Sequence, residues 1–161
     1  MLECDLPSPL AGLLRPLFQL RPPMSAMAHL VGKGSTGVDA VAQIDAILDQ
    51  AVITPALEAG LWLYVDELDR SHRVSQSIPG PTGSYWHGIM HRREGDFSNS
   101  HYWFRKVGAH PAMATIPDYS AHTLVDAVAA WSQKGSGNEA ALVALQRHEW
   151  TALFNHCAVG K

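Results

Sequence analysis

Residues 84–107 read SYWHGIMHRREGDFSNSHYWFRKV, and this stretch decides the fold class of the chain. The first part, from about Ser84 to Glu94, suits an α-helix, and a second helix is expected from about residue 96 to Val107. Gly95 lies between the two, where a residue without a Cβ atom allows the chain to turn sharply. The sequence therefore predicts a tight helical hairpin.

Apolar residues at helical spacing extend on both sides of this hairpin. The other segments expected to be helical are about 38–51, 55 to before Pro79, 119–131 and 139–157. Thr54, Asp96 and Asn138 stand where helix N-caps belong, and Pro55 suits the first helical position. No segment shows the sustained alternation of apolar and polar residues that a sheet would give. We predict an all-α, compact single-domain bundle of about five to six helices.

The composition fits one ordinary soluble domain. The chain has 161 residues, of which 47% are hydrophobic and 17% charged, so there is enough apolar material for one core. The net charge of −3 gives no basic footprint for nucleic acid or for an anionic membrane. No run approaches the roughly 18 apolar residues that span a bilayer. We expect neither nucleic acid nor a membrane as a partner.

The two ends of the chain bear on its cellular compartment and its oligomeric state. Cys4 and Cys157 lie far apart in the sequence, unlike the dense spacing of a disulfide-rich secreted domain, which favours the cytoplasm. Prolines are frequent in residues 1–35, and this segment ends in a glycine-rich stretch. We therefore predict an N-terminal arm over residues 1–35, outside the core, and a helical domain over 36–161. The arm is a candidate interface for a homo-oligomer.

Two imidazoles and one carboxylate share a face of the helix expected over residues 84–94. His87, His91 and Glu94 stand at positions i, i+4 and i+7, which project from one side of a helix. Such a set can hold a divalent metal, such as zinc or iron, and leave room for water or substrate. The spacing resembles half of a zincin motif. However, Gly88 replaces the general-base glutamate, so a metalloprotease is not supported.

A third histidine, His72, continues the apolar stripe of the preceding helix. That stripe contains Leu57, Leu61, Tyr64, Val65 and Leu68. A buried imidazole on such a stripe needs a partner or a cavity, because an unpaired buried polar group costs roughly 1–3 kcal/mol. One interpretation is a core histidine bonded to Asp69 or Gln76. The other is that His72 joins His87 and His91 in a site.

The residues around this face form a distinctive string. It consists of Leu61-Trp62, Asp69-Arg70-Ser71-His72 with Gln76, then Tyr85 to Asn99, Tyr102-Trp103-Phe104-Arg105 and Gly108. With this string the chain resembles a group of small, uncharacterised bacterial and fungal proteins that share an AH…Q helix followed by an H…HR(R/K)EGD…N…YW(F/Y)R hairpin. The resemblance implies no activity. It places in the shared pattern His72, Gln76, His87, His91, Arg92, Glu94, Asp96, Asn99, Tyr102 and Trp103.

Two functional hypotheses follow from these residues. The first is a small helical enzyme of hydrolase or lyase type that acts on a small polar molecule by histidine-based or metal-assisted acid–base chemistry, with an arginine to hold an anionic group. The candidate catalytic residues are His72, His87, His91, Glu94 and Tyr102. The candidate substrate-binding residues are Gln76, Trp86, Arg92, Asn99 and Trp103. The second hypothesis is a non-catalytic helical interaction domain whose HRREGD hairpin is a structural polar network.

Overall fold

The computed structural model describes residues 5–32, 34 and 37–160, and within them it contains eight α-helices, one short 3-10 helix and no strand. The elements are α1 (Ser8–Leu20), α2 (Val38–Gln50), α3 (Pro55–Tyr64), α4 (Leu68–Ser75), α5 (Pro81–Glu94), α6 (Phe97–Val107), η1 (Met113–Thr115), α7 (Ala121–Lys134) and α8 (Glu139–Ala158). The predicted all-α class is confirmed. The number of helices is higher than the five to six expected.

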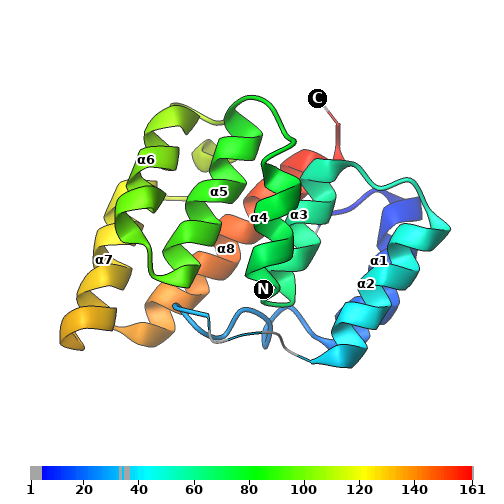
Figure 1. Cartoon of the computed structure of the whole chain (residues 1–161), viewed down its shortest axis with the longest axis horizontal. Helices are drawn as coiled ribbons and strands as arrows, with labels where there is room; N and C mark the ends of the chain where they lie inside the picture. The colour runs from blue at the N-terminus through cyan, green and yellow to red at the C-terminus, as the bar shows by residue number, and fades with distance from the viewer. Residues whose placement is uncertain (1–4, 33, 35–36, 161) are drawn as a thin grey trace.

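Helix α5 of the hairpin packs against α4 and helix α6 packs against α7, so the hairpin lies between these two helices (Figure 1). Helix α8 contacts α3 and α7, while α1 and α2 form a separate pair at one end. The largest aromatic side chains of the core come from three of these helices and are fully buried: Tyr64, Tyr85, Trp86, Trp150 and Phe154. One apolar core therefore holds α3, α5 and α8 together.

Local capping signals set several helix ends, as the sequence predicts. Thr54 accepts a hydrogen bond from the amide of Leu57, Asp96 from that of Asn99 and Asn138 from that of Ala141. Gly95 has a φ of 88°, a left-handed conformation that strains residues with a Cβ. The predicted hairpin over residues 84–107 is confirmed.

One long helix from residue 55 to before Pro79 was expected, and this prediction is wrong. The helix ends at Tyr64, and α4 starts at Leu68 with a new direction. Asp66 between them has a φ of 60° and pairs with the buried guanidinium of Arg93, which also donates to the carbonyl of Leu63 at 2.8 Å. Arg93, which lies far along the chain, thus stabilises a turn that the local sequence does not predict.

The N-terminal segment is also more than an arm. Leu14 and Leu17 of α1 are fully buried in the core. Gln146 of α8 donates to the carbonyls of Met27 and His29, both at 3.1 Å. The expectation that this segment lies outside the core is therefore wrong for residues 5–32. The remaining parts of the predicted arm, 1–4, 33 and 35, lie outside the described residues, and an interface with a second copy stays a prediction.

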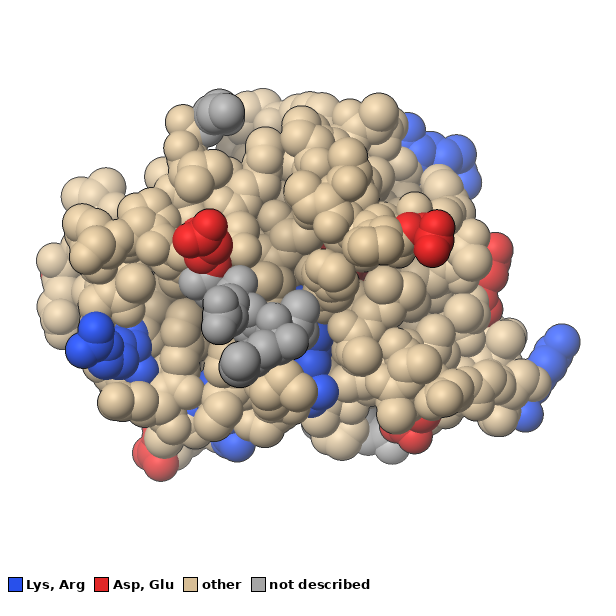
Figure 2. All heavy atoms as spheres, turned by 180° about the vertical axis from the view of Figure 1, so that it is seen from behind, with Lys and Arg blue, Asp and Glu red and all other residues tan. Residues whose placement is uncertain are grey.

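The face of the molecule that is turned away from the viewer in Figure 1 shows few concentrations of charge (Figure 2). On the face seen in Figure 2, Lys and Arg side chains and Asp and Glu side chains lie apart from one another, with uncharged residues between them. Among the helices that the structure describes, none combines the length and the apolar character needed to cross a membrane.

Candidate functional site

The structure brings the three predicted histidines together between α4 and α5. The ring centroid of His72 lies 5.1 Å from that of His87 and 5.3 Å from that of His91. The centroids of His87 and His91, one turn apart on α5, are 6.0 Å from each other. The sequence left two interpretations of His72 open, and the structure places its half-buried ring beside the other two. We call these three residues the histidine cluster.

Close packing of α6 on α5 gives the cluster its aromatic wall. A Cβ atom at Gly88 would lie 2.8 Å from the ring of Phe104, so only glycine fits at this crossing. The hydroxyl of Ser100 donates to the carbonyl of Gly88 at 2.6 Å and holds the two helices there. As a result, Trp103 lies flat against His87, with ring centroids 4.0 Å apart and planes inclined by 11°. Packing thus explains why glycine stands where a zincin has its glutamate.

His87 has one ring nitrogen engaged and one without a partner. Its Nδ1 atom lies 3.1 Å from the carbonyl oxygen of Gly83, which can only accept, so Nδ1 carries the proton. The Nε2 atom is then an acceptor, and it is buried with no hydrogen-bond partner among the described residues. Burial lowers the pKa of His87 to about 4, and the nearby charges of His72, His91 and Lys106 act in the same direction. The imidazole is therefore neutral at physiological pH.

His91 is more fully engaged than His87. Its Nδ1 atom lies 2.6 Å from a carboxylate oxygen of Glu94, and the side-chain amide of Asn99 lies 3.3 Å from its Nε2 atom. These neighbours come from the end of α5 and the first turn of α6. These two contacts hold the imidazole ring of His91 in one orientation.

The group of ligand atoms best placed for a metal differs from the predicted set of His87, His91 and Glu94. Within the described ranges, the one group of three or more such residues whose ligand atoms all lie within 4.8 Å of one another is His91, Glu94 and Asp96. His87 is not part of it. Asp96 also caps α6 through the amide of Asn99, and Glu94 already contacts His91. Two members of the predicted set are therefore retained and one is replaced.

A hollow of about 440 Å³ opens beside the histidine cluster. It is lined by residues of α4, the start of α5 and the end of α6: His72, Ser75, Gln76, Ile78, Gly80, Ser84, His87, Trp103 and Lys106. The side-chain amide of Gln76 lies 3.4 Å from Nε2 of His72. Four of the predicted site residues, His72, Gln76, His87 and Trp103, thus line one space, and their roles stay a prediction.

Ser75, Ser84 and Lys106 also line the hollow, and they are not among the predicted site residues. The sequence held a signal for Lys106, because it follows Trp103 by three residues on α6 and so projects from nearly the same side. Its ammonium nitrogen lies 4.7 Å from the ring centroid of Tyr102 and 4.8 Å from that of Trp103. Tyr102 itself is exposed and does not line the hollow.

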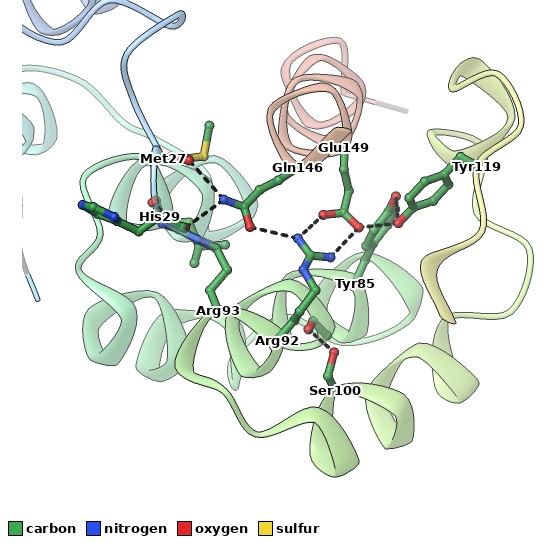
Figure 3. A network of polar contacts seen from close by, with 11 residues as sticks. Met27, His29, Tyr85, Arg92, Arg93, Ser100, Tyr119, Gln146 and Glu149 are labelled. Atoms are coloured by element: carbon green, nitrogen blue, oxygen red, sulfur yellow. Dashed lines mark hydrogen bonds and ion pairs between the residues drawn. The ribbon is translucent and has the colours of Figure 1, made fainter. Parts of the chain in front are cut away.

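Two predicted binding residues point away from the hollow. Arg92 is fully buried and makes two parallel contacts with Glu149 of α8, at 3.0 Å and 2.6 Å (Figure 3). Trp86 is also fully buried and lies in the core against Gly60. The prediction that these two side chains bind the substrate is corrected, because both belong to the contact of α5 with α3 and α8.

Arg92 and Glu149 belong to a buried polar network (Figure 3). The hydroxyl of Tyr119 donates to Glu149, and that of Tyr85 donates to Tyr119 at 3.2 Å. Burial and the negative charge of Glu149 raise the pKa of both tyrosines, so both phenols stay protonated as donors. The neighbouring Arg93 pairs with Asp66. The two arginines of the HRREGD string therefore stabilise contacts between helices and turns of the fold.

Two further histidine pairs lie outside the histidine cluster, and the sequence gave no defensible signal for either. The Nδ1 atoms of His101 and His122 are 2.7 Å apart, and Asp126 lies 2.9 Å from Nε2 of His101. His110 and His156 form the other pair, with ring centroids 4.7 Å apart. Neither pair lines the hollow.

The site thus combines a buried neutral imidazole, a positioned second imidazole and a hollow that reaches both solvent and the third imidazole. The resemblance noted over residues 61–108 stays a prediction. Comparisons with protein-family models, with curated proteins and with solved structures found no match to this chain.

Proposed function

We propose that this chain is a small helical enzyme of hydrolase or lyase type that acts on a small polar molecule in the hollow beside the histidine cluster. The observation that carries the proposal is the Nε2 atom of His87, which is buried and unpartnered in a residue only 3% exposed. Leaving such an atom unpaired costs about 1–3 kcal/mol. A ligand in the hollow would supply the missing hydrogen bond, which accounts for that cost.

His87 suits the role of general base. The carbonyl of Gly83 holds the tautomer in which Nε2 has a free lone pair, so a proton of the substrate or of a bound water can pass to it. The positive charge that develops on the ring strengthens the Nδ1 hydrogen bond to Gly83. His72 lines the same hollow and is partly exposed to solvent. A positioned base of this kind contributes about 10²–10⁴-fold to a rate.

The test is to incubate the protein with a mixture of small polar metabolites and to identify the consumed compounds by mass spectrometry. His87→Gln keeps a polar side chain of similar reach but removes the base. We expect its turnover to fall by about 100-fold or more. The matched control is His148→Gln, a half-buried histidine of α8 that does not line the hollow, and its turnover should equal that of the parent.

Two outcomes of this experiment would count against the proposal. One is a folded His87→Gln protein that turns over its substrate at the parent rate. The other is a parent protein that consumes no compound of the mixture, which would favour the interaction domain described below.

A metal-assisted form of the same reaction is the second candidate chemistry. The ligand atoms of His91, Glu94 and Asp96 lie close enough together to be tested as a zinc or iron site. An ion there would supply a water of lowered pKa near the histidine cluster. Elemental analysis of protein purified without chelator tests this form. Near-stoichiometric metal that is lost in His91→Ala supports it, and metal-free protein with full turnover assigns the chemistry to His87.

A non-catalytic interaction domain is the alternative function. The full burial of Arg92 and Arg93 and their pairing with carboxylates favour a structural role for much of the HRREGD string. This alternative predicts that His87→Gln lowers the unfolding temperature strongly and that the parent has no turnover to lose. The enzyme proposal predicts that turnover is lost while the unfolding temperature falls less, since His87 borders a hollow and its Nε2 atom forms no hydrogen bond that the substitution would break.

A further inference from the structure

We infer that the molecule bound in the hollow carries an oxyanion group, a carboxylate or a phosphate, which Lys106 holds near the amino-terminal turn of α5. This inference rests on the proposed function, because it names the class of substrate for the same hollow. It replaces the expectation from sequence that an arginine would hold an anionic group.

The charge of the hollow's lining supports an anionic ligand. Its nine residues include one lysine, two histidines and no carboxylate. In the part of the chain that the structure describes, no Asp or Glu side chain forms an ion pair with Lys106. The ammonium group instead lies over the faces of Tyr102 and Trp103, which hold it at the rim. A ligand anion would supply the charge-assisted partner that Lys106 lacks.

The start of α5 provides a second source of positive potential. This helix has 14 residues, and its N-cap residue, Gly80, offers no side-chain hydrogen bond to the first turn. Pro81, the first helical residue, has no amide hydrogen, so the free amides of this turn are those of Thr82 and Gly83, and with the helix dipole they favour an anion. Gly80 and Ser84 of this turn line the hollow together with Lys106, and the hydroxyl of Ser84 forms no hydrogen bond with another described residue. Donors from two elements, the hydroxyl of Ser84 on α5 and the ammonium group of Lys106 on α6, thus line the same hollow.

The unpartnered Nε2 atom of His87 makes this a reactive site and not only a cationic groove. His87 is buried, stacks on Trp103 and lines the same hollow as Lys106 and Ser84. A volume of about 440 Å³ lies within the range of small-molecule sites. A molecule held by its oxyanion at Lys106 therefore presents its remaining atoms to His87.

The experiment is a titration of the full chain with inorganic phosphate and, separately, with acetate, at ionic strength held constant with sodium chloride. Ring resonances of His72 and His87 in NMR spectra report binding. We expect saturable shifts with at least one of the two anions in the millimolar range. Lys106→Gln should weaken binding roughly tenfold, which is the loss of affinity expected when one charge-assisted hydrogen bond is removed. Lys134→Gln, at the end of α7 and away from the hollow, should bind within twofold of the parent.

The outcomes separate this inference from the proposed function. Absence of saturable shifts with both anions, or equal weakening by the Lys106 and Lys134 substitutions, would overturn the inference. So would a parent enzyme that consumes only uncharged compounds, although His87 would then still be the base. Conversely, His87→Gln should retain anion affinity within twofold. If that variant also keeps full turnover, the proposed function fails while the oxyanion site stands.

Discussion

His110 illustrates how burial sets the protonation of a single residue. The amide of Ala112 donates to its Nδ1 atom at 3.1 Å, and its Nε2 atom lies 3.1 Å from the hydroxyl of Thr82. Burial lowers the pKa of His110 to about 4, and the nearby charge of His156 adds to the effect. An unfolded histidine has a pKa of about 6.5, so the unfolded chain binds more protons between these two values.

The stability that neutral His110 contributes is therefore present above about pH 6.5 and is lost as the pH falls toward 4. We expect the unfolding temperature to drop between pH 7 and about pH 4.5, and to drop less in His110→Gln. Thermal unfolding followed by circular dichroism at several pH values measures this difference. His148→Gln serves as the control, and its pH profile should match that of the parent. Equal slopes for all three proteins would refute this account of His110.

At the scale of elements, the buried ion pair between Arg92 and Glu149 joins α5 to α8. Removing one partner strands the other charge in the core, so we expect Glu149→Leu to destabilise the protein by about 3–5 kcal/mol in urea unfolding. The double variant Arg92→Met with Glu149→Leu should recover most of that loss, because no charge is then left unpaired. Asp45→Asn breaks the exposed pair with Arg70 and should cost less than about 1 kcal/mol. A double variant as unstable as the single one would contradict this interpretation.

The whole molecule unfolds as one unit if the N-terminal segment belongs to the core. Leu17 is 0% exposed and Leu20 is 45% exposed on the same helix. Leu17→Ala should therefore cost about 2–5 kcal/mol and Leu20→Ala less than about 1 kcal/mol. Urea unfolding followed by both tryptophan fluorescence and circular dichroism should give one coincident transition. A detached arm would instead show similar, small effects for both substitutions.

Features with a local cause were predictable from the sequence. The α5–α6 hairpin and the caps at Thr54, Asp96 and Asn138 all depend on residues within a few positions of one another. The break between α3 and α4 was not predictable in this way. It depends on the contact of Asp66 with Arg93, which is 27 positions away.

The candidate site likewise has some features with a local cause and others that depend on residues far apart in the sequence. Helical spacing placed His87 and His91 on one face, but the approach of His72 depends on how α4 packs on α5. The same periodicity turns Arg92 away from that face, yet only its pairing with Glu149, 57 positions later, shows that the arginine is structural. Lys106 was missed because the sequence does not show which side of α6 borders a hollow.

The two faces of α5 give the protein a property that matters for redesign. His87 faces the hollow, while Arg92 on another side of the helix is bound into the frame through α8. Directed evolution of the hollow can therefore vary Ser75, Gln76 and Lys106 without entering the network that holds the helices together. In this respect the chain is a scaffold in which the lining of the hollow can change while the buried network stays the same.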